Sequence, residues 1–468
     1  MVFSSLEFLF LFLPLILVAY FVMPNRGKNA VLLIFSLMFY AWGEPVYVLL
    51  MLFSIGINYA FGRMIATRRD ARAAKWILIL SIVMNLLLLG VFKYGDFLVA
   101  NLNGLLHTAI PQPNLPLPIG ISFYTFKIIS YVIDVYGSRV KAQKNFINFG
   151  AYVTLFPQLT AGPIVRYATI AEELECRTHS MDQFSEGARR FMAGLGKKVL
   201  LANNIGILWD SMSNLGGSQM SVVAAWLGMI AYTFQIYFDF SGYSDMAIGL
   251  SKMFGFHIFE NFEYPYISKS ITEFWRRWHI SLGTWFREYV YIPLGGNRKG
   301  VGRQLFNLAV VWALTGIWHG ASWNFLAWGI YYCILLILEK LFLLRWLKKA
   351  PAIVGHVYTL FFVMVGWILF AFDQFSEGFA YIGYLFGAGG IPFLSGAALY
   401  ALQSNLPMLL LLCVASTPLM KKLYDKAVTK WNAGVLTTAE CIGIASIFIL
   451  SVAYLVDSSY SPFLYFRF

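Results

Sequence analysis

Long apolar runs separated by short polar stretches dominate the chain. The runs occupy residues 4–22, 30–42, 46–62, 76–92, 117–136, 222–254, 305–319, 323–344, 354–372, 406–419 and 441–456. Several of them approach the roughly 20 apolar residues that a helix needs to span a bilayer. A membrane β-barrel would show short alternating segments instead. The pattern therefore predicts an all-α polytopic membrane protein.

Four further stretches are apolar or amphipathic but irregular. Residues 146–165 are broken by two prolines and a glycine, which is tolerated at membrane depth only where protein or a cavity satisfies the backbone. Residues 191–209 are interrupted by two lysines, residues 379–394 are rich in glycine, and residues 93–116 resemble an interfacial segment. We therefore expect about 11 transmembrane helices together with re-entrant and interfacial helices.

Positive charge collects between alternate runs. Residues 63–75 hold five basic side chains against the single acid Asp70, and the stretches 26–28 and 139–144 are also basic. Short cytoplasmic loops of membrane proteins are enriched in lysine and arginine. Counting crossings back from residues 63–75 therefore predicts an N-terminus outside the cytoplasmic membrane.

The composition agrees with a membrane-embedded chain. Of the 468 residues, 12% are charged, which is about half the share found in a soluble domain. The formal net charge of +12 comes from the basic loops, so it indicates orientation in a bilayer and not a nucleic-acid partner. The four cysteines are scattered and lack the spacing of metal ligands, so we expect no metal site. One integral membrane domain over residues 1–468, with the lipid bilayer as its partner, is expected.

A histidine ends one of the apolar runs. His319 closes the run 305–319, and Gly316 and Gly320 flank it. An ionisable side chain inside a bilayer is costly and is for that reason a functional candidate. It is either a general base that its apolar setting keeps neutral or a histidine that packs helices together through a hydrogen bond. The pattern leaves both interpretations open, although the small neighbours permit close approach of a backbone or a ligand.

The segment before that run concentrates aromatic and basic side chains. Residues 273–303 hold six basic and two acidic side chains. Arginine donates paired hydrogen bonds to phosphate oxygens, which favours a cytosolic site for a phosphate-bearing molecule. The alternative is an interfacial helix whose arginines contact lipid phosphates. The predicted donor-binding residues are Trp275, Arg276, Arg277, Trp278, Arg287, Asn297, Arg298 and Lys299.

Two acids lie inside a long apolar run. Asp239 and Asp245 are six residues apart, and a helix of about 3.6 residues per turn places them on different faces. A paired-carboxylate site is therefore not expected. We interpret both as structural or site-supporting groups that hydrogen-bond to other helices.

Three motifs of the central segment resemble the membrane-bound O-acyltransferase family. They are EFWRRWH at residues 273–279, YVYIPLGGNR at 289–298 and GIWHG at 316–320. More narrowly, the chain resembles the bacterial branch that contains the alginate O-acetyltransferase subunit AlgI, peptidoglycan-acetylating relatives and the D-alanyl transferase DltB. Similar runs lie at residues 1–14, 39–43, 118–124, 161–164, 237–249 and 460–468. The resemblance thus covers nearly the whole chain.

The resemblance implies a ring of transmembrane helices around a thin catalytic centre, with the catalytic motifs in residues 271–320. The essential histidine of the family falls on His319 and its second histidine on His279, so both are expected to be catalytic. Members of this branch pass an acyl group from a cytosolic thioester across the membrane to an extracytoplasmic partner. The resemblance therefore implies acetyl-CoA or another acyl thioester as donor, no bound cofactor, and an SGNH-type acetyltransferase or an acyl carrier protein as partner.

We therefore expect an O-acetyltransferase of the bacterial inner membrane that acts on alginate or another exported polysaccharide. One alternative within the enzymes is D-alanyl transfer to teichoic acid. An alternative of another class is a transporter or flippase, which would also contain irregular helices and buried acids. The sequence shows no internal repeat of the kind that many transporters contain.

Overall fold

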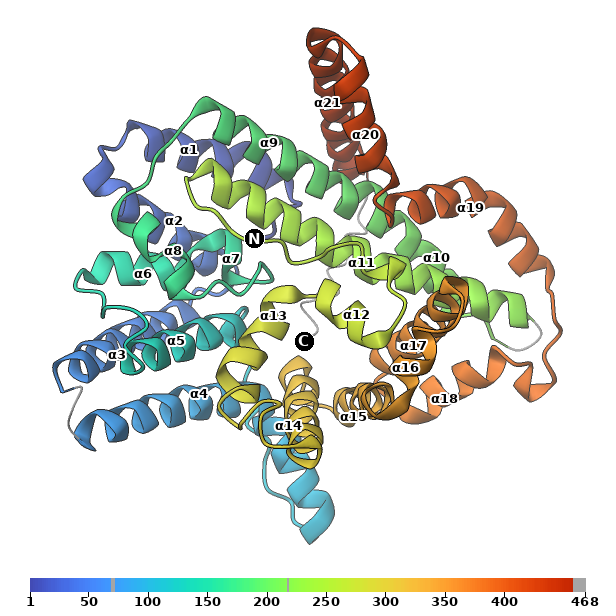
Figure 1. The fold of residues 1–468 in the computed structure, drawn as a ribbon, viewed down its shortest axis with the longest axis horizontal. Coiled ribbons are helices and arrows are strands. Elements are labelled where there is room, and N and C mark those ends of the chain that lie inside the picture. The colour runs from blue at the N-terminus through green and yellow to red at the C-terminus, as the bar shows by residue number, and fades with distance from the viewer. Residues whose placement is uncertain (69–71, 217–218, 458–468) are drawn as a thin grey trace. The chain divides into compact units, whose positions relative to one another are not determined.

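The protein is built from helices in both of its compact units. The computed structural model describes residues 1–68, 72–216 and 219–457, and every regular element in these residues is a helix (Figure 1). The two units are Met1–Phe191 with Tyr243–Phe259, and Met192–Gly242 with Glu260–Phe468. Two long helices, α9 (Met181–Gly196) and α11 (Val222–Met253), contribute residues to both units.

The first unit contains the N-terminal helices. Its other elements are η1 (Phe8–Phe12), α1 (Leu13–Val22), η2 (Asn25–Gly27), α2 (Lys28–Gly43), α3 (Tyr47–Thr67), α4 (Arg72–Leu106), α5 (Ile121–Tyr136), α6 (Phe146–Thr154), α7 (Phe156–Leu159) and α8 (Tyr167–Glu175). The predicted break in residues 146–165 is confirmed, because α6 ends at Thr154 and α7 is a single turn. The buried ammonium of Lys127 donates to the carbonyls of Tyr152 and Val153 at 2.6 and 3.3 Å. It thereby supplies donors to carbonyls at the end of α6, where helical N–H partners run out.

The second unit contains the histidine motifs. Its other elements are η3 (Lys197–Asn203), α10 (Asn204–Ser213), η5 (Pro265–Ile267), α12 (Ile271–Arg277), α13 (Ile280–Phe286), η6 (Arg287–Tyr291), α14 (Val301–His319), α15 (Trp323–Leu338), η7 (Glu339–Leu343), α16 (Leu344–Leu347), α17 (Ala352–Ala371), α18 (Phe375–Tyr384), η8 (Ala388–Gly390), α19 (Gly396–Ala415), α20 (Leu419–Lys430) and α21 (Ala433–Asp457). Helix α15 packs against both α12 and α14. These three helices bring the predicted motifs together.

The all-α polytopic class is confirmed, whereas the predicted count of about 11 transmembrane helices is not established. In the described residues, seven helices are long and apolar enough to cross a membrane. They are Tyr47–Thr67, Arg72–Leu106, Val222–Met253, Trp323–Leu347, Ala352–Ala371, Gly396–Ala415 and Ala433–Asp457. The N-terminal run forms the shorter apolar helix Phe8–Val22, and α2 has only 16 residues.

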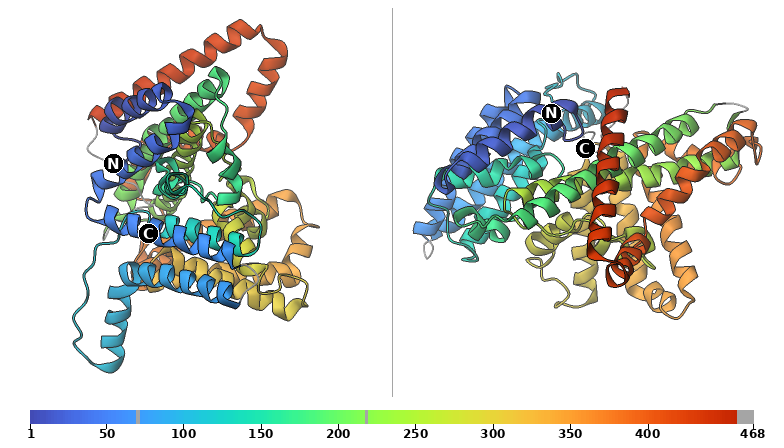
Figure 2. Two further views of the ribbon diagram at one scale, coloured as in Figure 1. Left: turned by 90° about the vertical axis from the view of Figure 1, so that its left-hand side faces the viewer. Right: turned by 90° about the horizontal axis from the view of Figure 1, so that it is seen from above.

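Some helix boundaries differ from the prediction. Helix α4 continues to Leu106, so much of the expected interfacial stretch 93–116 is an extension of the preceding helix. Helix α19 begins ten residues before the predicted 406 and contains Pro407. The basic residues after it belong to the separate helix α20, which precedes α21 at the red end of the chain (Figure 2). The similar run at residues 460–468 lies outside the described residues.

Candidate active site

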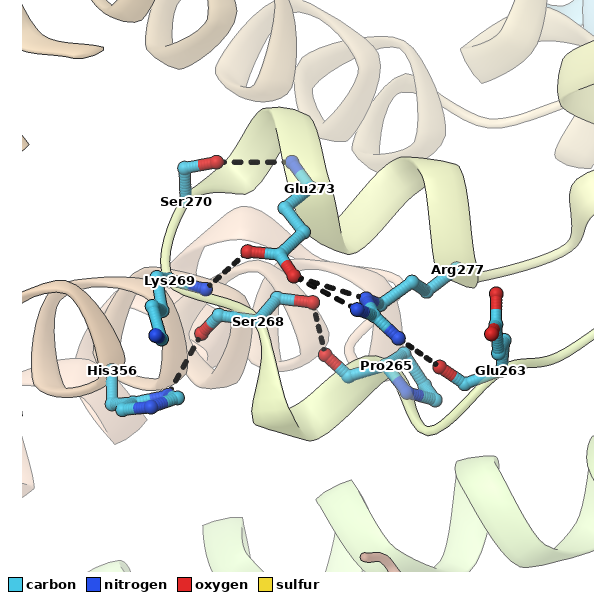
Figure 3. A network of polar contacts seen from close by, with 8 residues as sticks. All are labelled: Glu263, Pro265, Ser268, Lys269, Ser270, Glu273, Arg277 and His356. Atoms are coloured by element: carbon cyan, nitrogen blue, oxygen red, sulfur yellow. Dashed lines mark hydrogen bonds and ion pairs between the residues drawn. The ribbon is translucent and has the colours of Figure 1, made fainter. Parts of the chain in front are cut away.

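A capping box starts the short helix that carries the basic motif. Ser270 precedes α12, and its hydroxyl accepts a hydrogen bond from the Glu273 N–H at 3.0 Å. The Glu273 carboxylate reaches back to the Lys269 N–H, also at 3.0 Å. This reciprocal pair satisfies N–H groups that have no acceptor within the helix. Figure 3 shows the arrangement at the start of α12.

Arg277 is held within the same network (Figure 3). Its guanidinium donates to the Glu273 carboxylate at 3.1 Å and to the Glu263 carbonyl at 3.0 Å. Backbone pairing adds a third contact, because the Glu263 N–H donates to the Arg277 carbonyl at 2.9 Å. Arg277 therefore ties α12 to the preceding loop, and it is absent from the lining of both cavities described below.

His279 occupies a strained backbone position between α12 and α13. Its φ of 45° and ψ of 54° lie in the left-handed region, which costs an L-residue about 1–2 kcal/mol. Asn261 supports this turn, because its Oδ1 accepts from the Ser281 N–H at 3.0 Å and lies 3.3 Å from His279 Nδ1. The imidazole is 3% exposed and meets the Phe240 ring edge-on at 4.8 Å between centroids. Burial lowers the pKa of His279 to about 3, so the ring is neutral at physiological pH.

His319 is the last residue of α14 and lies among aromatic rings. Its imidazole is 5.0 Å from the rings of Trp318 and Trp328 and 5.4 Å from that of Phe370, between centroids. Helix α15 lies close to α14 at Gly316. A Cβ at this position would lie 2.5 Å from the Phe325 carbonyl oxygen, so only glycine fits there without a shift of the backbone. The expectation that small residues near His319 admit another backbone is therefore met by α15.

One small cavity is lined by both histidines. Its volume is about 250 Å³, and it also includes Thr272, Trp275 and Trp278. The Trp318 ring is near both imidazoles, 6.1 Å from His279 and 5.0 Å from His319 between centroids. The two motifs that lie far apart along the sequence are thus neighbours in the second unit.

A larger cavity of about 1040 Å³ is lined by basic residues. It contains six of the eight predicted donor-binding residues, namely Trp275, Arg276, Arg287, Asn297, Arg298 and Lys299. No acidic residue lines it in the described chain. Trp275, Arg276 and Gly283 line both cavities. The arginine-rich wall therefore adjoins the histidine cavity.

The turn between η6 and α14 is fixed by side chains of α14. Gly295 and Gly296 have φ of 110° and 56°, which glycine adopts without steric cost. The buried Asn307 amide donates to the Gly296 carbonyl at 3.0 Å, and Arg303 donates to the Leu294 carbonyl at the same distance. This turn presents Asn297, Arg298 and Lys299 to the larger cavity.

The profile of the membrane-bound O-acyltransferase family matches residues 9–376. The chain belongs to this family.

Two relatives match the whole chain and a third matches part of it. It is 40% identical to a "Probable alginate O-acetylase AlgI" of Azotobacter vinelandii over 100% of both chains. It is 31% identical to a "Peptidoglycan O-acetyltransferase" of Helicobacter pylori, over 100% of this chain and 98% of that protein. A "Teichoic acid D-alanyltransferase" of Bacillus subtilis is 28% identical over 57% of this chain and 72% of that protein. This membrane-bound O-acyltransferase is therefore an acyltransferase, which favours the enzymatic interpretation over a transporter or flippase.

The two predicted acids lie in different units of the acyltransferase. Asp239 forms a buried ion pair with Lys198 of η3, with 2.6 Å between Lys198 Nζ and Asp239 Oδ1. Asp245 accepts from the guanidinium of Arg190 at 2.8 Å. Both acids thus contact a basic residue of another helix, and neither lines the two cavities.

Several lining residues were absent from the sequence prediction. Tyr291, Gln304 and Lys340 line the larger cavity. Tyr291 lies inside the motif at residues 289–298 and Gln304 lies six residues after its end. The Gln304 amide donates to the Tyr291 hydroxyl at 3.1 Å, so both could have been found from the motif and the residues that follow it. Lys340 lies within the apolar run 323–344, which gave no sign of binding. In the described chain, no group of three or more His, Cys, Asp or Glu is placed to hold a metal ion.

Proposed function

We propose that this protein transfers acetyl groups from a cytosolic thioester to hydroxyl groups of an exported polysaccharide. The observation that carries the proposal is that His279 and His319 line one cavity, which shares a wall with a large basic cavity. One cavity can hold an anionic carrier while the other holds the reacting acyl group. This division suits a reaction in which a charged donor stays on one side of a membrane.

The larger cavity is suited to the phosphate groups of a thioester donor. Arg276, Arg287 and Arg298 provide planar guanidinium groups that can bind phosphate through two hydrogen bonds each. A volume of about 1040 Å³ is large enough for a nucleotide-sized molecule. We propose acetyl-CoA as the donor, with its acyl chain directed past Trp275 toward the histidines. Another acyl thioester, including one on an acyl carrier protein, would present a related phosphate group.

His319 is proposed as the general base of the transfer. Its imidazole would take the proton of an acceptor hydroxyl while that oxygen attacks the thioester carbonyl carbon. The tetrahedral intermediate would then collapse, breaking the carbon–sulfur bond, and the thiolate would recover the proton from the imidazolium. The products are an O-acetyl ester and a free thiol, and no other reactant is required.

His279 is proposed to act in its neutral form. Asn261 Oδ1 can only accept a hydrogen bond, so its position near Nδ1 favours the tautomer that carries the proton on Nδ1. Nε2 then carries a lone pair. In this tautomer His279 would orient an acceptor or thiol hydrogen, whereas a charged imidazolium would be disfavoured by burial.

The proposed setting is the bacterial inner membrane with an extracytoplasmic N-terminus. The basic segment 273–303 would lie on the cytosolic side, as the enrichment of lysine and arginine in cytoplasmic loops suggests. His319 would lie deeper, at the far end of α14, within a ring of helices. An SGNH-type acetyltransferase outside the membrane would receive the acetyl group and complete transfer to the polymer. D-alanyl transfer is less well supported, because that relative matches 57% of the chain.

Replacing His319 tests the proposal. We expect His319→Ala to reduce the acetyl content of the polysaccharide by at least about 100-fold, the contribution of a general base. The measurement is the O-acetyl content of polymer from cells that produce equal amounts of inserted protein. His107→Ala is the control, because His107 is exposed and lies outside both cavities. Near-normal acetylation by His319→Ala would refute the catalytic assignment.

A further inference from the structure

A buried acid that the proposed mechanism does not use lies against the start of α12. Glu339 is 1% exposed and belongs to the candidate span Trp323–Leu347. A buried carboxyl group is costly unless hydrogen bonds satisfy its oxygens. Here Oε1 accepts from the Ile271 N–H at 2.6 Å. Oε2 accepts from the N–H and the hydroxyl of Thr272 at 2.8 and 2.6 Å.

These contacts complete the N-terminal cap of α12. The first N–H groups of a helix have no acceptor within it, and the Ser270–Glu273 capping box supplies acceptors only for Lys269 and Glu273. Glu339 supplies acceptors for the N–H groups of the first two helical residues, Ile271 and Thr272. An isolated helix of seven residues is too short to be stable by itself. The position of α12 therefore depends on its contacts with other elements, and the hydrogen bonds from Glu339 are among them.

The residues held in this way line the two cavities. Thr272 lines the histidine cavity, while Trp275 and Arg276 line both cavities. Glu339 is thus one hydrogen bond away from the wall that the acyl group must pass. A shift of α12 would move the indole and guanidinium groups on which donor binding depends.

The neighbour of Glu339 lines the larger cavity directly. Lys340 is exposed and belongs to that lining. Both residues lie in η7, a π-helical turn between α15 and α16. A π-turn inserts an extra residue into a helix and alters which side chains face inward, and such turns are frequent at functional sites. In η7, one residue faces α12 and the next faces the cavity.

We propose that η7 forms part of the donor site, an inference that rests on the proposed donor function of the larger cavity. Glu339 is a positioning residue that fixes α12, and with it Trp275 and Arg276, in the binding geometry. Lys340 binds a phosphate of the donor directly. A purely structural Glu339 would contribute to folding without changing the donor affinity of the folded protein.

The test compares donor affinity with turnover in the full-length protein. Dissociation constants for coenzyme A and acetyl-CoA are measured calorimetrically in nanodiscs. KM and kcat for acetyl-CoA are measured in membranes that contain the acceptor polymer. The variants are Glu339→Gln, Thr272→Val, Lys340→Ala and, as a reference for the cavity itself, Arg276→Ala. Lys349→Ala and Glu377→Gln are matched controls, because both residues are exposed and lie outside the two cavities.

We expect Glu339→Gln to raise KM and Kd about tenfold, the effect of one charge-assisted hydrogen bond, with kcat within about twofold. Thr272→Val, which removes one donor to Glu339, should raise Kd in the same direction. The double variant should bind no more weakly than Glu339→Gln alone, because the two residues act through one contact. Lys340→Ala should raise Kd about threefold to tenfold and reduce the salt dependence of binding.

The binding measurements distinguish a failure of the η7 inference from a failure of the proposed donor cavity. Unchanged Kd in folded Glu339→Gln and Lys340→Ala, with weaker binding in Arg276→Ala, would overturn this inference and leave the donor cavity intact. Unchanged Kd in Arg276→Ala as well would overturn the proposed donor cavity itself. If Glu339→Gln does not fold, Thr272→Val and Lys340→Ala carry the test, and unchanged Kd in both would overturn the inference.

Discussion

At the scale of single residues, His279 combines two costs that a folded protein seldom keeps without a function. Its backbone is left-handed, and its imidazole is buried at 3% exposure. Strained residues of this kind cluster at active sites, where the surrounding structure holds them in place. Asn261 holds the backbone after His279 in place. Its backbone carbonyl accepts a hydrogen bond from the Ile280 N–H, and its Oδ1 accepts one from the Ser281 N–H, both at 3.0 Å.

The burial of His279 predicts a specific pH dependence of stability. Burial lowers its pKa from 6.5 to about 3, so the unfolded chain binds a proton between these values while the folded protein does not. The stabilisation is complete above pH 6.5 and is lost progressively as the pH falls toward 3. We expect this group to remove about 2 kcal/mol from the free energy of unfolding between pH 7 and pH 5.

Unfolding of the detergent-solubilised protein at pH 7 and pH 5 measures this effect. Wild type should lose more stability than His279→Gln, which cannot be protonated in this range. The comparison with His279→Gln cancels the contributions of other titrating groups. An equal loss in both proteins would show that the imidazole is accessible to protons in the folded state.

The sequence singled out the two candidate histidines more readily than the residues that surround the site. His279 and His319 lie in recognisable motifs, whereas Glu339 and Lys340 lie within an apolar run that carries no motif. For Arg277, donor binding stays a prediction, and the structure adds a structural role. Its position in the basic motif suggested donor binding, but its guanidinium contacts Glu273 and the Glu263 carbonyl. A one-dimensional pattern does not state which way a side chain points.

At the scale of elements, the contact between α14 and α15 places His319. Gly316 and Gly329 lie opposite each other, and a Cβ at Gly329 would meet the Trp312 carbonyl oxygen at 2.5 Å. Close backbone approach through small residues is a common way for membrane helices to pack. This approach brings Trp328 of α15 against His319.

Adding a methyl group at Gly316 should separate these helices. A Cβ there would lie 2.5 Å from the Phe325 carbonyl oxygen, and backbone atoms cannot turn aside as a flexible side chain can. We expect Gly316→Ala to lower the free energy of unfolding by about 1–3 kcal/mol and to reduce acetylation. The measurements are denaturant unfolding and polymer acetyl content.

Gly302→Ala provides the control on the same helix. A Cβ at Gly302 meets no atom within 4 Å, so alanine should be neutral or stabilise α14 by up to about 1 kcal/mol. Equal stability of the Gly316→Ala and Gly302→Ala variants would contradict a tight contact at Gly316.

At the scale of the whole molecule, the charge pattern predicts a single orientation in the membrane. Single cysteines are introduced at Lys75, Thr108 and Arg298 in a protein whose native cysteines are replaced by serine. We expect labelling of positions 75 and 298 only after a membrane-impermeant reagent gains access to the cytosol. Position 108 should react from outside, because it follows α4, which leads outward in this orientation.

Labelling of position 75 or 298 from outside in intact cells would refute the orientation. Arg69, in the strongly basic stretch, lies outside the described residues, and Lys75 of α4 takes its place in the experiment. Labelling depends only on correct insertion, so the result does not depend on whether substitution at Arg298 impairs donor binding.

The sequence by itself determined the class of the protein and the positions of most helices. The length of an apolar run and the charge of a loop are local properties of the sequence. The thickness of the bilayer relates the first to the number of spans, and the enrichment of basic residues in cytoplasmic loops relates the second to the expected orientation. Only the tertiary structure decided which segments meet. The contact between Glu339 and Ile271 joins residues 68 positions apart, and one cavity joins His279 to His319. Such contacts depend on side-chain shape across packed helices, which hydrophobic periodicity along one helix does not encode.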